Sequence, residues 1–331
     1  MIIAEIAQAH DGSLGNAYAY IEALAATGVD AIKFQTHIAE AESSIHEPFR
    51  VKFSKQDATR FEYWKRMEFS LDQWKGLKAH ADAHGIELIS SPFSNLAVDW
   101  LEEIGVKRYK IGSGEVSNWL MLEKIAKTGK PLILSSGMSS WEELDQTVEF
   151  LKKYGNSLSI LQCTTAYPTA PEQWGLNVIQ ELKDRYQLPI GFSDHSGDIF
   201  ASLSAASLGA EIFEFHVVFD KRQFGPDTLA SITIDQTEQM VKGIKAIQKA
   251  LKNPIDKTQI KPFQDLKKIF EKSLAVNRPL KKGDIIQPEF LESKKPKGFG
   301  IDAKDYAEVI GKKINKDLSQ WGFLNWEDLE S

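Results

Sequence analysis

Residues 188–227, LPIGFSDHSGDIFASLSAASLGAEIFEFHVVFDKRQFGPD, contain the pattern that decides the fold predicted for this chain. Two short, mostly apolar runs, Leu188–Phe192 and Ile212–Phe215, each end in polar residues that include a histidine, and a small-residue segment of helical length separates them. This pattern predicts a strand, a helix and a second strand, with His195 and His216 at matching places. Because neighbouring parallel strands lie roughly 5 Å apart, the two imidazoles can share one divalent cation. The pair alone is equally compatible with two hydrogen-bonded loop histidines.

The same pattern recurs along the whole chain from Met1 onward. A short β-branched or apolar run is followed by a polar cluster and then by an amphipathic stretch of roughly 10 to 18 residues. Eight runs are candidate strands: Ile2–Ile6, Ala31–Phe34, Glu87–Ser90, Lys107–Ile111, Leu132–Leu134, Ser159–Leu161, Pro189–Phe192 and Ile212–Phe215. Eight such units predict an α/β protein with a (β/α)8 TIM barrel. A doubly wound open sheet is the alternative, but it would gather its ligand residues at one switch point, whereas here every strand end is polar.

Polar side chains mark the carboxyl end of each predicted strand. They are Glu5, Lys33, Gln35, Ser90, Ser91, Lys110, Ser113, Glu115, Ser135, Ser136, Thr164, Thr165, Ser193, Asp194, His195 and His216. Barrel enzymes place their active sites at these ends. Burying a lysine is unfavourable, so Lys33 and Lys110 indicate an anion between them, and the surrounding hydroxyl groups favour phosphate. Any one lysine or serine could be a solvated loop residue, but a complete ring of them is poorly explained in that way.

Composition bounds the class of protein. A chain of 331 residues with 42% hydrophobic residues is long for one domain, which favours a large domain and a small one. The net charge of -6 argues against general nucleic-acid binding. The single cysteine, Cys163, cannot form an internal disulfide and fits a reducing compartment. With no basic leader region and no apolar run of roughly 18 residues, we expect a soluble cytoplasmic protein.

The connection after the second predicted strand is unusually long. It runs from Thr36 to about Ser70, whereas such connections usually have about 2–6 residues. Basic and aromatic residues alternate within it, and it would lie on the catalytic face of the barrel. A lid or an arm that contacts a partner is the simplest interpretation, although its charges could equally be ordinary solvated ones.

His80 and His84 lie four residues apart on a predicted outer helix. This is a metal-ligand spacing, but the zinc-protease pattern requires a glutamate directly after the first histidine, and this chain has Ala81 there. We therefore expect no catalytic role for the two histidines.

Periodicity changes after the predicted helix 237–251. Residues 253–269 are polar, contain two prolines and predict a linker. Residues 270–331 show short strands, turns and only short helical pieces, which is typical of a small separate domain. The predicted organisation is a barrel domain at 1–252, a linker at 253–269 and a C-terminal domain at 270–331.

With these residues in view, the chain resembles the N-acetylneuraminate (sialic acid) synthase family, which includes the legionaminic and pseudaminic acid synthases. The matching phrases cover nearly the whole chain in the same order: IIAEIAQAHDGS, DAIKFQTH, SSPFS, YKIGSGE, LILSSGMSS, LQCTTAYPTAP, IGFSDHS, EIFEFH with FGPD, SLAVNRPLKKGDII and SKKPKGFGI. The tail resembles the antifreeze-like (SAF) capping domain of these synthases. The resemblance implies condensation of phosphoenolpyruvate with an N-acetylhexosamine, such as N-acetylmannosamine, to give a nonulosonic acid and phosphate.

The resemblance also implies roles for particular residues. The metal ligands would be His195 and His216, holding a divalent ion, most commonly manganese, with magnesium or cobalt as options. Glu5, Glu115 and Lys110 would be catalytic. The phosphoenolpyruvate-binding residues would be Lys33, Ser91, Lys110, Ser113, Ser135, Thr165 and Ser193, and the sugar-binding residues would be Gln35, Tyr167, Asp227 and Lys295. The protein would be a homodimer in which each C-terminal domain caps the barrel of the partner and brings Lys295 to it.

Two positions depart from the family pattern. Thr165 stands where the family has a phosphate-side asparagine. Lys295 stands where the family has an arginine that reaches the acyl group of the sugar, so a compact ammonium replaces a planar guanidinium that can form two parallel hydrogen bonds. The identity of the amino sugar therefore stays open. Two alternatives also stay open, a phosphoenolpyruvate-dependent synthase of another 3-deoxy-ulosonate and a non-enzymatic carbohydrate-binding protein.

Overall fold

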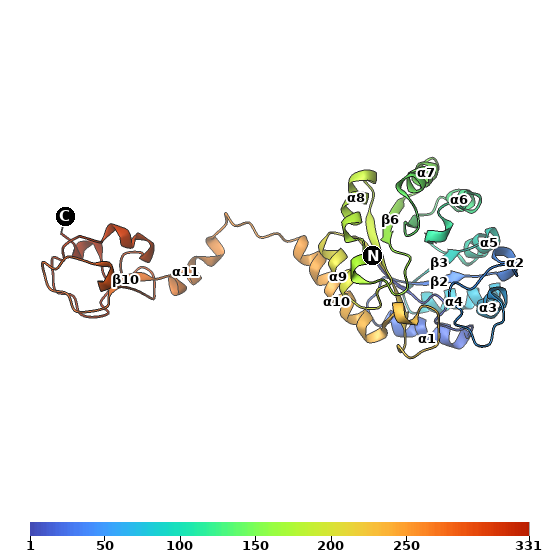
Figure 1. The fold of residues 1–331 in the computed structure, drawn as a ribbon, viewed down its shortest axis with the longest axis horizontal. Helices are drawn as coiled ribbons and strands as arrows, with labels where there is room; N and C mark the ends of the chain where they lie inside the picture. The colour runs from blue at the N-terminus through green and yellow to red at the C-terminus, as the bar shows by residue number, and fades with distance from the viewer. Residues whose placement is uncertain (331) are drawn as a thin grey trace. The chain divides into compact units, whose positions relative to one another are not determined.

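A computed structural model describes residues 1–330, and the chain divides into two units, Met1–Asn253 and Pro254–Ser331. Figure 1 shows the strands and helices of the first unit. Its eight barrel strands are parallel and follow one another in chain order, and β1 pairs with both β2 and β8. This pairing closes the sheet into a barrel. The predicted (β/α)8 barrel is thus confirmed, and the open doubly wound sheet is excluded.

All eight predicted strands are present, with ends that shift by at most three residues. The barrel strands are β1 (Ile2–Glu5), β2 (Ala31–Thr36), β3 (Glu87–Pro92), β4 (Tyr109–Ile111), β5 (Leu132–Ser135), β6 (Leu158–Cys163), β7 (Ile190–Asp194) and β8 (Ile212–Val218). A further short strand, β9 (Ile232–Thr233), pairs with the end of β8. His195 follows β7 directly, whereas His216 lies inside β8, because that strand continues beyond its predicted end.

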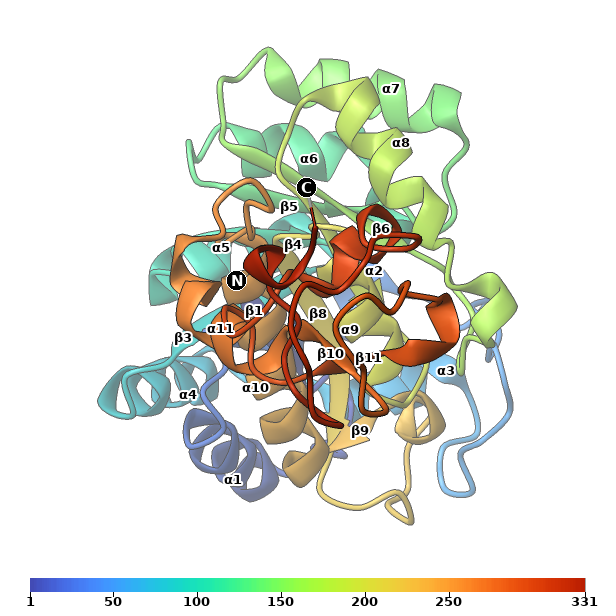
Figure 2. The ribbon, with the colours of Figure 1, turned by 90° about the vertical axis from the view of Figure 1, so that its left-hand side faces the viewer.

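Helices cover the outside of the barrel (Figure 2). They are α1 (Leu14–Ala25), α2 (Ala39–Glu42), α3 (Arg60–Met67), α4 (Leu71–Ala83), α5 (Asn95–Ile104), α6 (Trp119–Ala126), α7 (Trp141–Lys152), α8 (Leu176–Tyr186), α9 (Phe200–Ser207) and α10 (Ile234–Leu251). Several begin at a capping box; the side chains of Ser70 and Ser140, for example, accept a backbone N–H from the third residue of α4 and α7. The apolar faces of these helices and the outer faces of the strands form the main core.

The barrel interior is divided into an apolar layer and a polar layer. Six buried side chains fill the amino-terminal half: Ile3, Ala31, Ile89, Ile133, Leu161 and Ile212. Side chains two residues apart on a strand point to the same face. The next inward positions are therefore Glu5, Lys33, Ser91, Ser135, Cys163 and Glu214, and all of them are buried. The apolar layer closes the floor, and the polar residues are held at one level above it.

The second unit has its own small core. Strands β10 (Ser273–Val276) and β11 (Leu291–Lys294) pair antiparallel, and buried aliphatic side chains, among them Leu274 and Ile286, pack around them. The identity of this unit as an antifreeze-like domain stays a prediction. No helix within residues 1–330 is both long enough and apolar enough to span a bilayer.

The segment predicted as a linker is not wholly irregular. A short helix, α11 (Gln264–Phe270), occupies its end, and the boundary between the two compact units falls between Asn253 and Pro254 in the sequence. Leu266, Ile269 and Phe270 follow the spacing of one helix face, a pattern that the polar composition of the segment obscured in the sequence.

Candidate active site

The carboxyl ends of the barrel strands surround a cavity of about 510 Å³. Every site residue predicted within the barrel lines it: Glu5, Lys33, Gln35, Ser91, Lys110, Ser113, Glu115, Ser135, Thr165, Tyr167, Ser193, His195, His216 and Asp227. The remaining predicted residue, Lys295, belongs to the C-terminal unit, where its ammonium lies 4.8 Å from the ring of Phe270. Thus the barrel residues share one site, while their individual roles stay predictions.

Two buried lysines share one carboxylate at the inner end of the cavity. The Nζ atoms of Lys33 and Lys110 lie 3.9 and 3.5 Å from Oε1 of Glu214, and the lysine side chains are both 3% exposed. Lys33 also forms an ion pair of 2.6 Å with Glu5. The other oxygen of Glu214, Oε2, has no hydrogen-bond partner among residues 1–330. A buried and unpartnered oxygen of this kind is unfavourable unless a ligand or a water contacts it.

Serine hydroxyls surround the two lysines. Lys110 donates a 2.6 Å hydrogen bond to Ser135, and Lys33 donates one of 3.3 Å to Ser91. The hydroxyl of Ser193 donates to Glu214 over 3.4 Å. These serines come from β3, β5 and β7, so rigid strands position them. Ammonium and hydroxyl donors that converge in this way suit a phosphoryl group.

The two lysines differ in protonation tendency. Burial alone lowers the pKa of Lys33, but the carboxylates of Glu214 and Glu5 outweigh it, so its pKa is raised. For Lys110, burial outweighs the attraction of Glu214, and its pKa is lowered. Lys33 therefore stays protonated, and an anion bound near Lys110 would raise the pKa of that lysine and favour its charged form.

The two predicted metal ligands lie side by side. The rings of His195 and His216 are 5.2 Å apart, and the ring of Tyr167 packs 4.2 Å from that of His195. Nδ1 of His195 lies 2.9 Å from the carbonyl oxygen of Thr164. A carbonyl only accepts, so Nδ1 carries a proton, and Nε2 is the nitrogen that offers a lone pair once the imidazole is neutral, as in most histidines that ligate metals. The donor set fits one divalent ion.

The histidines also differ in charge. Burial and the neighbouring His195 hold the pKa of His216 well below 6.5, so His216 is neutral. Burial lowers the pKa of His195 as well, but Cys163 and the carbonyl of Thr164 oppose it and raise that pKa to about 9. A metal ion must then displace a proton from His195 in order to bind.

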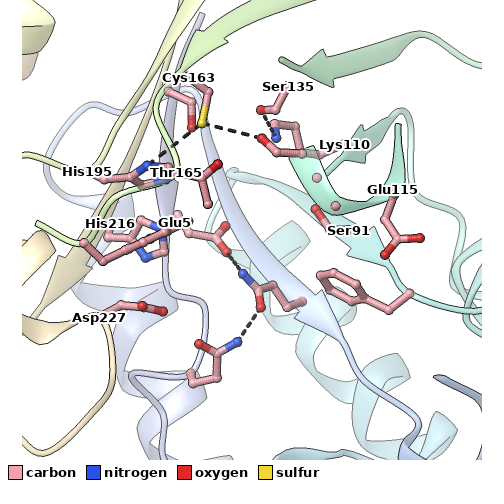
Figure 3. A pocket seen from close by; sticks show the side chains of 18 of the residues that line it. Glu5, Ser91, Lys110, Glu115, Ser135, Cys163, Thr165, His195, His216 and Asp227 are labelled. Carbon is pink, nitrogen blue, oxygen red and sulfur yellow. Dashed lines mark hydrogen bonds between the residues drawn. The ribbon is translucent and has the colours of Figure 1, made fainter. Parts of the chain in front are cut away.

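Across the cavity from the histidines lie Lys110 and Ser135, with Glu5 between the two groups (Figure 3). Gln35 donates a 2.9 Å hydrogen bond to Glu5, which fixes the orientation of that carboxylate. Glu115 accepts a 2.8 Å hydrogen bond from Asn118, and burial raises its pKa. Each predicted catalytic carboxylate therefore has at least one oxygen held by a neighbouring side chain.

Gly137 allows close packing beside the predicted phosphate site. Its backbone N–H donates a 3.0 Å hydrogen bond to Ser113. A Cβ atom at this position would lie 2.5 Å from the hydroxyl of Thr165 and 2.7 Å from that of Ser113, too close for any side chain. The hydroxyl of Thr165 therefore faces the same small region as Ser113, although it is shorter than the asparagine that the family pattern has there.

The long connection after β2 forms a wall of the cavity. His37 is stacked between Trp64 and Phe93, with ring distances of 3.9 and 4.7 Å, and its Nδ1 lies 2.6 Å from Glu42. Buried Tyr63 and Trp64 anchor the segment from within. The segment is thus folded against the barrel mouth.

Arg50, in the same segment, reaches the side of the cavity where sugar binding is predicted. Its guanidinium forms a 2.9 Å ion pair with Asp227 and lies 4.2 Å from the ring centre of Tyr167. Burial raises the pKa of Asp227, and Arg50 opposes that rise. The side chain of Arg50 is 45% exposed, and its charge is paired at the edge of the cavity.

Several lining residues were not predicted from the sequence. They are Gln8, His37, Glu42, Glu47, Arg50, Arg60, Trp64, Phe93, Gly112, Gly114, Met138, Cys163 and Glu214. Cys163 and Glu214 could have been predicted from the sequence, because each lies two residues before a predicted site residue, Thr165 or His216. Glu214 also shares the inward face of its strand with His216.

Comparison with known proteins assigns the family. The model of the NeuB family matches residues 20–256, most of the barrel unit. The chain belongs to the NeuB family. It is 36% identical over 326 residues to the N,N'-diacetyllegionaminic acid synthase of Campylobacter jejuni, with 97% of both chains covered. It is 33% identical to human N-acetylneuraminate-9-phosphate synthase, covering 95% of this chain and 88% of that protein.

A solved structure of a relative has the same fold as this NeuB-family chain. The N-acetylneuraminic acid synthetase of Leptospira borgpetersenii, solved with citrate, superposes with a TM-score of 0.70 at 30% identity, covering 80% of this chain and 89% of that one. The predicted resemblance to the sialic acid synthases is thus confirmed.

Proposed function

We propose that this chain condenses phosphoenolpyruvate with the open-chain form of an N-acetylated hexosamine, giving a nonulosonic acid and phosphate. One observation carries the proposal: a buried lysine pair ringed by serine hydroxyls and a neighbouring histidine pair line the same cavity. The first group suits a phosphoryl group and the second suits a divalent cation. The similarity to named synthases of three nonulosonic acids supports the same reaction.

Phosphoenolpyruvate would bind with its phosphate against Lys33, Lys110 and the serine hydroxyls. The two ammonium groups already lie within a protein environment that holds them in place, so little reorganisation is needed on binding. They offset the charge that develops on the phosphate as its C–O bond breaks. The carbon–carbon bond forms between C3 of phosphoenolpyruvate and the aldehyde carbon of the sugar.

A divalent ion, for which we propose Mn²⁺, would be held by Nε2 of His195 and by His216. When bound, it supplies Lewis-acid polarisation of the aldehyde oxygen, which makes the aldehyde carbon electrophilic. Tyr167 packs against His195 and excludes water from one side of that imidazole. Glu115 stands at the cavity with a raised pKa and would orient the water that adds to C2.

We also infer that the acceptor sugar is uncharged. The outer half of the barrel cavity has two arginines, and each is already paired with a carboxylate: Arg50 with Asp227 at 2.9 Å and Arg60 with Glu47 at 3.5 Å. Two further carboxylates, Glu42 and Glu115, line the same cavity. A second phosphate group on the sugar would meet this negative surface without an unpaired arginine among the described barrel residues.

A phosphate-release assay tests the proposal. The full-length protein is incubated with phosphoenolpyruvate, Mn²⁺ and, separately, N-acetylmannosamine, its 6-phosphate, N-acetylated amino sugars with two acetamido groups, and phosphorylated aldoses. Release with an unphosphorylated N-acetylated sugar supports both inferences. Release only with N-acetylmannosamine 6-phosphate would contradict the uncharged acceptor, and release only with a phosphorylated aldose would assign a different ulosonate synthase. No release with any sugar would contradict the proposed reaction.

We propose further that the protein acts as a homodimer in which the C-terminal unit supplies Lys295 to the barrel of the other chain. Helix α11 supports a partner contact, since Leu266, Ile269 and Phe270 are 49, 57 and 61% exposed on it. Apolar side chains that are exposed together usually mark an interaction surface. A second copy of this chain is the proposed occupant, because the family resemblance supplies that arrangement.

A further inference from the structure

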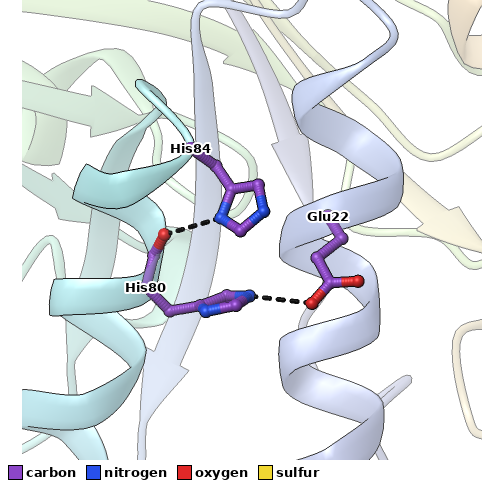
Figure 4. Close-up of side chains that lie close together, drawn as sticks. All are labelled: Glu22, His80 and His84. Atoms are coloured by element: carbon purple, nitrogen blue, oxygen red, sulfur yellow. Dashed lines mark hydrogen bonds and ion pairs between the residues drawn. The ribbon is translucent and has the colours of Figure 1, made fainter.

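We propose a second divalent-cation site on the outside of the barrel, between α1 and α4, formed by Glu22, His80 and His84. Each residue offers one ligand atom, and these atoms all lie within 4.8 Å of one another. Figure 4 shows the imidazoles of His80, on α4, and of His84, the residue directly after α4, facing the carboxylate of Glu22 on α1. None of the three residues lines the cavity in the barrel, so this site is separate from the one proposed for catalysis.

The two histidines are arranged as a chelating pair. They lie one helical turn apart, with ring centres 4.4 Å from each other. Nδ1 of His84 donates a 2.9 Å hydrogen bond to the carbonyl oxygen of His80, so the proton resides on Nδ1. Nε2 of His84 is left with its lone pair, which is the state that a metal ligand needs.

The carboxylate completes the set. Nε2 of His80 donates a 3.0 Å hydrogen bond to Oε1 of Glu22, and a bound cation would take the place of that proton between the two atoms. The ring of Tyr18 packs edge-on against His80 at 4.8 Å and restricts its rotation. Among residues 1–330, Glu22 forms no ion pair with a lysine or an arginine, so its charge is available to a cation.

The donor types indicate which cation would bind. Two imidazole nitrogens and one carboxylate oxygen favour Zn²⁺, Ni²⁺ or Co²⁺ over Mg²⁺ or Ca²⁺, which prefer oxygen ligands. The side chains of His80 and Glu22 are 27% and 57% exposed, so water can occupy the remaining coordination positions. Such an ion would join α1 to α4 and would stabilise the folded barrel, because the unfolded chain does not hold the three groups together.

Zn²⁺ titration of the full-length protein tests the site. Calorimetry should show one more bound Zn²⁺ ion per chain in the wild type than in His84→Asn or Glu22→Gln. If a variant still binds that ion, its affinity should be lower by about 10–100-fold, which is the usual effect of losing even an indirect metal partner. His46→Asn is the matched control, since it removes an exposed loop histidine and should change nothing.

Thermal unfolding provides a second measurement on the same proteins. Zn²⁺ should raise the melting temperature of the wild type and of His46→Asn more than that of Glu22→Gln, which keeps its size but loses its charge. All variants must match the wild type in circular dichroism without metal, and His84→Asn is exposed enough to do so. Equal stoichiometry, affinity and melting shift in wild type, His84→Asn and Glu22→Gln would overturn the proposal.

Discussion

At the scale of single residues, the pairing of two lysines with two glutamates determines the charge at the inner end of the cavity. Lys33 and Lys110 both approach Glu214, and Lys33 also contacts Glu5. Buried charges persist only where they are paired, so this group holds its cations in place before any substrate arrives. An entering phosphate would then meet donors that are already oriented.

Lys110→Ala should raise the KM for phosphoenolpyruvate far more than the KM for the sugar. A charge-assisted phosphate contact is worth about 1.5–3 kcal/mol, which corresponds to roughly 10- to 150-fold. Steady-state kinetics with each substrate varied in turn measure the difference. Lys124→Ala is the control, because Lys124 pairs with Asp99 on the surface. An equal increase in both constants would move Lys110 out of the phosphate site.

His195→Ala and His216→Ala should each lower kcat by at least about a thousandfold, since Lewis-acid polarisation contributes several kcal/mol. Each variant should fold, because both rings line the cavity and do not pack between the strands and the helices. Metal-reconstituted protein is assayed for phosphate release, and circular dichroism checks the fold. Near wild-type turnover in both variants after chelation and re-addition of metal would contradict the shared ion.

Cavity residues could be predicted from the sequence where they lie at strand ends, because strand periodicity gives the direction of their side chains. They could not be predicted on the long connection. The ring from Glu5 to His216 could be read from polar residues at strand ends, and most of its members line the cavity. The exceptions are Ser90, Ser136, Thr164 and Asp194. Glu214 could have been found by counting two residues back from His216 along β8. Arg50 could not, because nothing local to its sequence indicates that it reaches Asp227, far along the chain.

At the scale of elements, the connection between β2 and α4 gives the cavity its outer wall. Its length indicated a special role, and its position over the strand ends follows from the barrel. Its path does not follow from the sequence, because tertiary contacts of Tyr63 and Trp64 determine it. Helix α11 was missed for another reason, because the polar composition of its segment is typical of a linker and obscures the helical spacing of Leu266, Ile269 and Phe270.

Arg50→Ala should shift the acid limb of the pH profile to higher pH. Burial already raises the pKa of Asp227 and Arg50 lowers it, so removing the guanidinium raises that pKa further. Asp227 then takes up its proton at a higher pH. The rate of any step that needs the ionised carboxylate therefore begins to fall at a higher pH than in the wild type. The profile of kcat/KM for the sugar measures this shift.

Arg50→Lys is the matched control for that profile, because it keeps a positive charge near Asp227 and should retain most of the wild-type acid limb. If Arg50→Ala and the wild type share one acid limb, the Arg50–Asp227 pair has no influence on sugar handling.

At the scale of the whole molecule, the two units fold around separate cores, so the C-terminal unit must dock on a barrel if Lys295 is to reach a barrel cavity. A homodimer with exchanged C-terminal units predicts complementation. His195→Ala and Lys295→Ala chains, each impaired alone, should regain activity when subunits exchange, because each mixed dimer then has one site with no lesion. Native mass spectrometry confirms the exchange. Mixed dimers that stay as inactive as their parents would rule out this arrangement.

The central claim is that the cavity joins phosphoenolpyruvate to an amino sugar with cleavage of the C–O bond, and an isotope experiment tests it most directly. Phosphoenolpyruvate labelled with heavy oxygen in the bridge between C2 and phosphorus is supplied with the sugar that supports turnover. Mass spectrometry then locates the label. The account predicts labelled phosphate and a nonulosonic acid whose new C2 oxygen comes from water. Label retained in the organic product, or phosphate released without a sugar adduct, would contradict it.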